Sequence, residues 1–492
     1  MTKPYAPSSE FSESDVVTID DEGNMLVDWK GPDDPDRPSN WTFARKWGIV
    51  VTTSMITFVV SFCSSVYSNA IPDVQHEFHV SPTVSQLVIS LYVFGFAFGP
   101  MIWGPASELY GKTRPLWIGY ALFCILQIPI ALAKDIYTFL IFRFLSGLAG
   151  SSTLAILGGM FIDFLVDPNE RGVATAIFSM ATFCGPALGP IIGSICEARL
   201  GRVWISWVTL IAGVVFGVPA FLVTPETQES VILRRKAREL RKAKGKDGVQ
   251  SPSAKRDESL QISVFVRKYL TKPIRMFFQE PILIFFTFYM SLVYGIIYLT
   301  FTMYPLAFRR DRKWGAIKAS LPFLGILLGV VVACVLIAIH SIYYVTAKYQ
   351  KLKHHVPETR LPPMILGSLL LPAGLFWFTW TSNPETTWIP QVLSGIFIAC
   401  GAVMVFMSGV VYIIEVYLAD ANSALAVNNF VRSAFAAGFP LYMTNLFSSA
   451  GTHLGGFVVG GLCLVLLPFP VMFWKERSHK PLVELERKAE DA

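Results

Sequence analysis

Charged residues are scarce in this chain of 492 residues. Asp, Glu, Lys and Arg together make up 15% of it, whereas an ordinary soluble domain carries about 25%. Hydrophobic residues account for 53% of the chain, and the mean hydropathy is +0.50. So little charge cannot cover a large surface against water. The composition therefore excludes an ordinary soluble protein and favours one embedded in a lipid bilayer.

Cysteine and histidine are also scarce, with seven of each. The cysteines lie inside or at the ends of apolar runs without paired spacing, which is typical of small buried residues rather than of disulfides or zinc ligands. In HEFH, residues 76–79, the second His follows at i+3, whereas a zinc-protease helix needs i+4. We therefore expect no metal site and no cofactor. Because no catalytic cluster is present either, we expect no enzyme.

Long hydrophobic runs are abundant instead. A helix needs about 20 apolar residues to cross the hydrocarbon, where no water satisfies the backbone of other structures. Twelve runs meet this length: 48–70, 85–105, 116–133, 137–162, 173–196, 203–223, 281–305, 319–344, 363–381, 388–414, 424–447 and 454–474. The sequence thus predicts an all-α, multi-pass membrane protein with 12 transmembrane helices that contacts the lipid bilayer.

A basic connection divides the runs into two sets of six. Residues 224–280 contain 14 Lys and Arg against 7 Asp and Glu, and basic loops stay cytoplasmic. We therefore predict five regions: a disordered cytoplasmic N-terminus (1–46), an N-terminal six-helix bundle (47–223), a basic cytoplasmic linker (224–280), a C-terminal six-helix bundle (281–474) and a cytoplasmic tail (475–492). No folded basic domain is present to bind nucleic acid. Two matched halves around a central site are the plan of many secondary transporters.

One loop conflicts with this orientation. RRDRKW, residues 309–314, is basic but falls on the outer side. Either this loop binds anions, or the seventh and eighth runs are misplaced. We favour the first interpretation, because the second would invert every other loop.

The connection between the second and third runs, GPASELYGKTRPL, ends in Gly-Lys-Thr like a nucleotide-binding P-loop. Ala106 occupies the place of the second P-loop glycine, and the preceding run is a helix rather than a strand, so we exclude nucleotide binding. The loop instead has a spaced set of small and charged residues, namely Gly104, Glu108, Gly111, Lys112 and Arg114. Glycines allow a tight turn and close helix approach. The charges either latch one conformation or form a plain basic turn.

Three further features lie within the fourth and fifth runs. Arg143 is a charged residue in an apolar run, which indicates a functional position unless the side chain extends to the membrane surface. Asp163 is 20 residues further along, about 30 Å on a helix, so it cannot pair with Arg143 and is expected to join the cytoplasmic latch with Arg171 or Arg114. The fifth run repeats glycine every four residues beside two prolines, which predicts a bent, closely packed helix: Gly185, Pro186, Gly189, Pro190 and Gly193.

These motifs together resemble the major facilitator superfamily, and more closely its fungal twelve-span drug:proton antiporter branch. The loop at 104–114 is similar to the superfamily's signature, although Glu108 stands where Asp is frequent and Leu109 where a basic residue is frequent. GPALGPIIGS resembles the antiporter motif, and Arg143 resembles an arginine linked to proton coupling in the superfamily. Further stretches match the branch: DPNERG (167–172), TPET (224–227), PETRLPPMILG (357–367) and NSALAVNNFVRSAFAAGFPLY (422–442).

The resemblance implies an alternating-access exporter with two pseudo-symmetric bundles. It implies a small apolar or amphipathic substrate, such as a drug, toxin or secondary metabolite, and protons as the coupling ion. It also implies a monomer in the plasma membrane, with the vacuolar or a vesicle membrane as alternatives. No Asp or Glu lies at mid-membrane, so proton coupling lacks its usual carboxylate.

Aromatic residues make up 14% of the chain, and some are expected to line the substrate cavity. The expected lining residues are Tyr289, Tyr294, Tyr298 and Phe301 in the seventh run and Asn428, Asn429 and Arg432 in the eleventh. Because Arg143 and Arg432 lie in a core without carboxylates, a dedicated exporter of an anionic metabolite is an alternative. A non-transporting membrane sensor is another, but it usually needs a large cytoplasmic domain.

Overall fold

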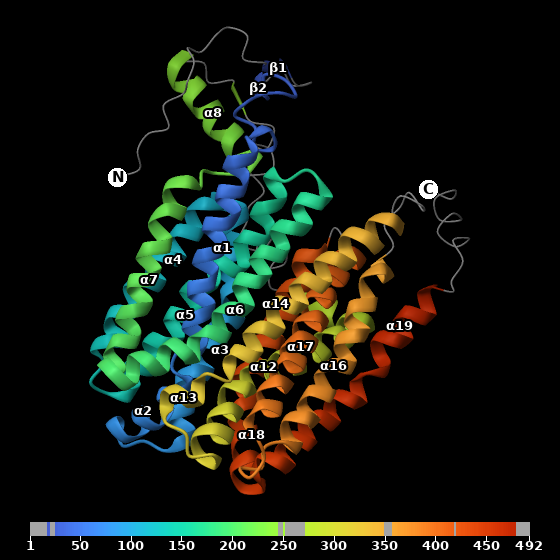
Figure 1. Ribbon diagram of the computed structural model, residues 1–492. Helices are drawn as coiled ribbons and strands as arrows, with labels where there is room; N and C mark the ends of the chain where they lie inside the picture. Colours follow the sequence, from blue (N-terminus) through green and yellow to red (C-terminus); the bar gives the residue numbers. More distant parts are fainter. Residues whose placement is uncertain are drawn as a thin grey trace.

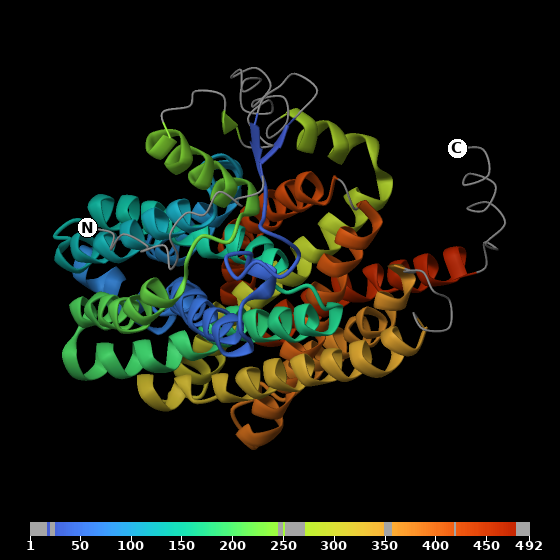
Figure 2. The same cartoon turned by 90° about the horizontal axis from the view of Figure 1, so that it is seen from above.

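The computed structural model describes residues 17–19, 25–244, 249–250, 271–348, 357–417 and 420–478. Nearly all of this part is helical, and the long helices run side by side (Figure 1). Seen from above, the helices of the N-terminal half lie beside those of the C-terminal half (Figure 2). The all-α membrane fold expected from the sequence is confirmed.

Six long helices form the N-terminal half: α1 (Phe43–Ser65), α3 (Pro82–Tyr110), α4 (Thr113–Leu132), α5 (Ile136–Phe164), α6 (Pro168–Leu200) and α7 (Arg202–Val223). Their ends follow local chemistry. Ser81 caps α3, with its hydroxyl accepting from the Val84 N–H, and Pro82 occupies the first helical position. Gly111 and Gly201 adopt φ of 90° and 86° where the chain turns into the next helix, and such angles favour glycine.

The C-terminal half is built from α12 (Pro281–Pro305), α14 (Phe323–His340), α16 (Leu361–Trp380), α17 (Trp388–Tyr417), α18 (Ala421–Leu466) and α19 (Pro468–Ser478). Short pieces extend or join these helices: the π-helices η4 (Leu306–Asp311) and η5 (Ser341–Val345), α13 (Ala316–Ser320) and the 3₁₀-helix η6 (Pro357–Arg360). α18 contains a break at Gly451, where φ is 82° and ψ is 162°. α18 therefore contains most of both the run expected at 424–447 and the run expected at 454–474.

Within the described residues, eleven helices are long and apolar enough to cross a membrane. The expected run 424–447 is helical, as the first part of α18, but it is not among the eleven. Its polar residues, including Asn428 and Arg432, lower its hydropathy. This segment contacts α3 and α12, so protein side chains rather than lipid surround much of it. Large apolar side chains are exposed on the outer helices, such as Leu222 on α7 at 77%, as expected for a lipid-facing surface.

Small elements gather at the end of the molecule that carries α8 (Glu229–Lys244) (Figure 1). A three-stranded sheet joins β1 (Val17–Ile19), β2 (Met25–Val27) and β3 (Val249–Gln250), with β1–β2 antiparallel and β2–β3 parallel. η1 (Pro38–Asn40) follows on the N-terminal side, and α11 (Lys272–Gln279) precedes α12. At the opposite end, η2 (Ser68–Ala70) and α2 (Ile71–Phe78) follow α1. Following the orientation predicted from the sequence, we call this end the outer end and the end with α8 the cytoplasmic end.

The disorder expected for residues 1–46 stays a prediction, and the described part of this segment packs on α8. Lys236 of α8 pairs with Asp36 at 3.0 Å and stacks on Trp29, and Arg37 pairs with Glu229 at 3.0 Å. The acidic segment therefore packs on the basic helix by charge complementarity, which composition alone does not reveal. Residues 1–16, 20–24, 245–248, 251–270 and 479–492, where much of the expected disorder, linker and tail falls, lie outside the described residues.

Candidate transport site and gates

Arg143 lies in the interior of the N-terminal half and is fully buried. It comes from α5 and donates to the Val88 carbonyl of α3 at 3.0 Å and to the Cys63 carbonyl and thiol of α1 at 3.1 and 3.2 Å. The guanidinium also stacks on the rings of Tyr92 and Tyr67, 4.4 and 5.0 Å from their centroids. Within the described residues, no carboxylate pairs with it. Arg143 thus joins three helices and does not extend to the membrane surface.

The glycine repeat of α6 packs directly on α1. A Cβ at Gly185 would lie 2.7 Å from the Phe58 carbonyl oxygen, and one at Gly193 only 1.9 Å from the Val66 carbonyl oxygen. Gly189 between them faces α1 equally closely. Such separations are too short for any other residue, so the four-residue spacing creates the close contact that the sequence predicts.

The prolines of the same motif provide polar contacts. Pro190 has no N–H to donate to the Pro186 carbonyl one turn earlier, and the Ser65 hydroxyl of α1 donates to that carbonyl instead, at 2.7 Å. Asn69, just beyond α1, donates to the Pro190 carbonyl at 3.3 Å and to the Ser194 hydroxyl at 2.7 Å. The motif therefore joins the outer halves of α1 and α6 by packing and hydrogen bonds together.

The loop between α3 and α4 is held by a residue that the sequence analysis did not select. The Glu226 carboxylate, just after α7, accepts from the backbone N–H groups of Lys112 at 3.0 Å and Thr113 at 3.2 Å. Gly111 makes this approach possible, because a Cβ there would lie 2.5 Å from a Glu226 carboxylate oxygen. The signal for Glu226 was its place in TPET, directly after the sixth apolar run.

Lys112 forms the ion pair of this loop. Its Nζ lies 2.6 Å from Asp163 near the end of α5 and donates to the Gly159 carbonyl at 2.7 Å. The other Asp163 oxygen accepts from the Thr227 hydroxyl at 2.8 Å. Asp163 therefore joins the loop network as expected, but its cationic partner is Lys112.

Four other residues are expected in this latch, and their part in it stays a prediction. Arg171, in the first turn of α6, donates through Nε to the Leu165 carbonyl at the end of α5. Arg114 is exposed at the start of α4. Glu108 is partly exposed in the last turn of α3. A Cβ at Gly104 would meet no atom within 4 Å, so close helix approach does not explain that glycine in this conformation.

The outer end holds a second charged group, which links the two halves. Arg309 of η4 donates to the Asn69 carbonyl at 2.7 Å and lies 3.6 Å from Asp73 of α2. Glu197, near the end of α6, lies close enough to Asp73 and to Arg309 to interact electrostatically with both. We define these as the outer charge group: Asp73, Glu197 and Arg309. Sequence analysis missed it, although RRDRKW was the signal.

The rest of that basic loop is bound by the protein itself. Arg312 donates to Gln391 at 3.0 Å and to the Thr386 carbonyl at 2.7 Å, and Lys318 stacks on Trp314 at 4.5 Å. The loop lies at the same end as α2, opposite α8 (Figure 1). The three arginines of the loop thus have partners within the protein, and the seventh and eighth runs are helical near their expected positions.

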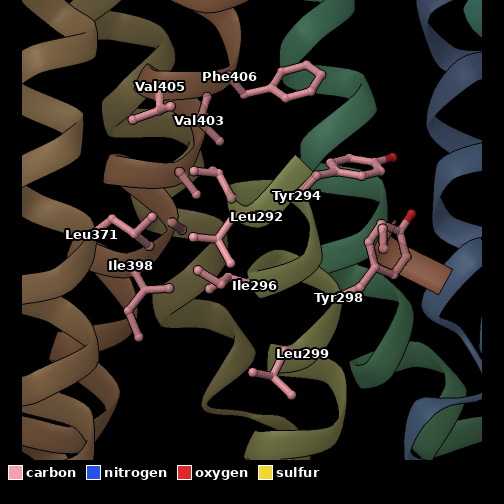
Figure 3. Close-up of a cluster of buried hydrophobic side chains, with 14 of the residues drawn as sticks. Leu292, Tyr294, Ile296, Tyr298, Leu299, Leu371, Ile398, Val403, Val405 and Phe406 are labelled. Carbon is pink, nitrogen blue, oxygen red and sulfur yellow. The ribbon is translucent and has the colours of Figure 1, made fainter. Parts of the chain in front are cut away.

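Aromatic and polar side chains meet between the halves at the middle of the molecule. Arg432 of α18 lies over the rings of Phe406 and Tyr294, at 4.4 and 4.8 Å from their centroids, and donates to Asn429. Asn429 in turn donates to the Phe96 carbonyl of α3 at 3.0 Å. Figure 3 shows Tyr294, Tyr298 and Phe406 on the side of the C-terminal half that faces the green and blue helices of the other half.

Hydrogen bonds cross between the halves on the outer side of this cluster. The Tyr298 hydroxyl donates to Ser64 of α1 at 3.1 Å, and Gln86 of α3 donates to Thr302 of α12 at 2.8 Å. Phe301 packs beside Tyr298 and stacks on Phe323 of α14 at 5.8 Å. The outer parts of the two halves are therefore in contact in this conformation.

Two residues expected to line the cavity lie elsewhere. Tyr289 faces Ser368 of α16 and Cys463 of α18 inside the C-terminal half, because five residues separate it from Tyr294 and turn it to another face of α12. Asn428 is fully buried and donates to Thr287 at 3.2 Å. Both side chains brace the C-terminal half.

Two helical halves that meet around a polar, aromatic centre define a class of membrane transport protein. Residues 53–440 match the family model described as Major Facilitator Superfamily. The chain belongs to this superfamily, and the MFS fold expected from the sequence is confirmed.

Its relatives are fungal. The chain is 45% identical over 452 residues to the citrinin biosynthesis cluster MFS transporter mrr1 of Monascus ruber, covering 91% of this chain and 90% of the relative. It is 37% identical to the cercosporin MFS transporter CTB4 of Cercospora nicotianae, covering 95% and 91%. Among solved structures, the xylose transporter XylE from E. coli in a partially occluded inward open conformation matches with a TM-score of 0.64 at 14% identity, covering 89% and 98%. This last match concerns the fold alone.

Proposed function

We propose that this transporter exports a small, largely apolar organic molecule, such as a secondary metabolite, in exchange for protons. The cluster of Tyr294, Tyr298, Phe406 and Arg432 between the halves supports a central binding site for such a molecule. The names of relatives from biosynthesis clusters support a secondary metabolite as cargo. The protein acts as a single chain in the plasma membrane, where export removes the compound from the cell.

The outer charge group is the observation that carries proton exchange. Two neighbouring carboxyl groups repel each other when both are ionised, so Asp73 and Glu197 together offer a place where a proton can bind. Arg309, from the opposite half, compensates the remaining charge. Opening the outer end would separate Arg309 from the two carboxyl groups, and the loss of a nearby cation favours the protonated form of a carboxyl group. An exporter that is driven by protons needs a group that takes them up on the outer side.

Other charges near this group are already occupied. On α2, Glu77 pairs with Arg202 of α7 at 2.7 Å, and on α13, Lys318 stacks on Trp314. Proton uptake at the outer end therefore depends chiefly on Asp73, Glu197 and Arg309. The coupling role expected for Arg143 stays a prediction, because its titratable contacts are a thiol and two phenols.

Proteoliposomes that contain a pH-sensitive dye test this function. A panel of neutral, anionic and cationic aromatic compounds is added with and without an imposed pH gradient. We expect at least one compound to be carried against its gradient while protons move in the opposite direction, and Glu197→Gln to abolish this exchange. Glu385→Gln is the control, because Glu385 is an exposed carboxylate in the connection between α16 and α17. A transport rate that is the same with and without the pH gradient would refute proton exchange.

A further inference from the structure

Arg432 is a cation between the two halves that lacks a counter-charge among the described residues. Its described contacts are the Asn429 side chain and the faces of the Tyr294 and Phe406 rings. The residue is only partly buried, but its Nε–H group is buried and has no hydrogen-bond partner. A buried donor of a charged group is costly to leave without an acceptor. The site is therefore incomplete without an acceptor that carries negative charge.

The surroundings of Arg432 also restrict the shape of such an acceptor. Tyr294 and Phe406 stack on each other at 5.7 Å with 26° between their planes. Phe183 of α6, in the other half, meets Phe406 edge to face at 5.2 Å. Flat aromatic molecules gain from offset or edge contacts with such rings, beyond the area that they bury. An aliphatic body of equal size lacks this gain.

We propose that the substrate class of this site is a planar aromatic molecule with one anionic oxygen group, whose charge binds Arg432 and whose ring packs among Tyr294, Phe406 and Phe183. This inference rests on the proposed function, since it concerns the central binding site of the same exporter. It goes further by setting the charge of the ligand: an anion, rather than a neutral or cationic amphipathic compound.

The same geometry connects the ligand to the conformation of the protein. Asn429 holds the Arg432 guanidinium through its oxygen and the Phe96 carbonyl of α3 through its amide nitrogen. An anion that draws Arg432 toward itself takes the donor away from the Asn429 oxygen. Binding in the C-terminal half thus loosens a contact between the halves, as a substrate that triggers the transport cycle must do.

Equilibrium binding to the purified protein in detergent, without any pH gradient, tests the proposal. The probes are 2-naphthoate, its neutral isostere 2-naphthamide, and cyclohexanecarboxylate as an anion without an aromatic ring. We expect 2-naphthoate to bind at pH 7 at least about 10-fold more tightly than either control. A hydrogen bond to a charged group contributes about 1.5–3 kcal/mol, or about 10- to 150-fold in affinity.

Variants assign the effect to the side chain. Arg432→Gln should weaken 2-naphthoate binding by about 10-fold or more and leave 2-naphthamide unchanged, whereas Arg432→Lys should retain part of the preference for the anion. Arg310→Gln is the matched control, since Arg310 is exposed at the outer end beside Asp311. The thermal transition of each variant shows whether it is folded. If Arg432→Gln does not fold, Arg432→Lys still tests the role of the guanidinium group.

Three results would overturn the inference: equal binding of naphthoate and naphthamide, an unchanged preference in Arg432→Gln, or no binding of naphthoate. None of them depends on proton movement, so the failure of this inference is distinct from failure of the proposed function. Conversely, proton exchange driven only by neutral or cationic compounds would preserve the proposed function and refute the anionic class.

Discussion

The contact between α1 and α6 supports a prediction that separates close packing from the general effect of a helical glycine. In Gly193→Ala, the new Cβ would lie 1.9 Å from the Val66 carbonyl oxygen. Backbone atoms cannot rotate away as a side chain can. The two helices must therefore move apart by about 1 Å to reach the shortest separation that real Cβ atoms show, 3.0 Å.

The expected cost follows from the contacts that this movement disturbs. Forcing extra atoms into a packed core costs about 1–3 kcal/mol. Moving the helices apart also weakens the bond from Ser65 to Pro186 and that from Asn69 to Ser194, each worth about 1 kcal/mol. The higher helix propensity of alanine offsets about 1 kcal/mol of this loss of stability. We expect a net loss of about 2–3 kcal/mol in the free energy of unfolding.

Gly158→Ala provides the matched control. Gly158 also lies inside a long helix, α5, but a Cβ there meets no atom within 4 Å. This variant should unfold at the same temperature as the unchanged protein or at a higher one, because only the propensity effect remains. Thermal unfolding of both variants in the same detergent measures the difference. If Gly193→Ala were as stable as Gly158→Ala, close packing of α1 on α6 would not be what stabilises this pair of helices.

Two further predictions concern the cytoplasmic loop and Arg143. Glu226→Gln removes the charged acceptor of the Lys112 and Thr113 N–H groups, so amide hydrogen exchange of residues 110–116 should rise by about 10-fold or more. Glu239→Gln, in the exposed Arg235 pair of α8, should leave this exchange unchanged. Arg143→Lys keeps the charge, but one ammonium group cannot reach all three acceptors on Val88 and Cys63, so thermal unfolding should show a loss of about 1–3 kcal/mol. Full stability combined with lost transport would instead assign Arg143 to proton coupling.

Helix positions and close-packing faces could be predicted, because they depend on residues that are near one another in the sequence. Apolar length predicted the helices, and the four-residue glycine spacing predicted the close face of α6. The run 424–447 is also helical, although it is too polar to count among the eleven helices that are long and apolar enough to cross a membrane. It was harder to predict toward which neighbour each side chain of a helix points. Tyr289 shares α12 with Tyr294 and Tyr298 but points into the C-terminal half, as a five-residue step requires.

Contacts between distant segments could not be predicted from the sequence. Asp73, Glu197 and Arg309 come from three elements in two halves, and nothing in their local sequence shows that they meet. Glu226 reaches the loop at Lys112 only because α7 ends beside α3 and α4. Likewise, the acidic N-terminal segment looked disordered, because its partner α8 lies far along the chain.

The positions of these contacts determine what must change when the outer end opens. The cytoplasmic loop is bound within its own half and the segment after α7, through Lys112, Asp163 and Glu226. The outer contacts cross between the halves instead, in the hydrogen bonds of Tyr298 with Ser64, Gln86 with Thr302 and Arg309 with Asn69.

A neutral hydrogen bond contributes about 0.5–1.5 kcal/mol net, and one to a charged group about 1.5–3 kcal/mol. These three bonds therefore sum to about 2.5–6 kcal/mol. A change of one unit in a pKa corresponds to about 1.4 kcal/mol, and an anion at Arg432 adds an interaction of similar size to a charged hydrogen bond. Each event alone is therefore comparable with only the lower part of that range. On the proposals made here, the substrate lowers the cost of opening the outer end, and protons bind to the outer charge group once it is open. The two therefore bind at successive stages of the cycle and move in opposite directions.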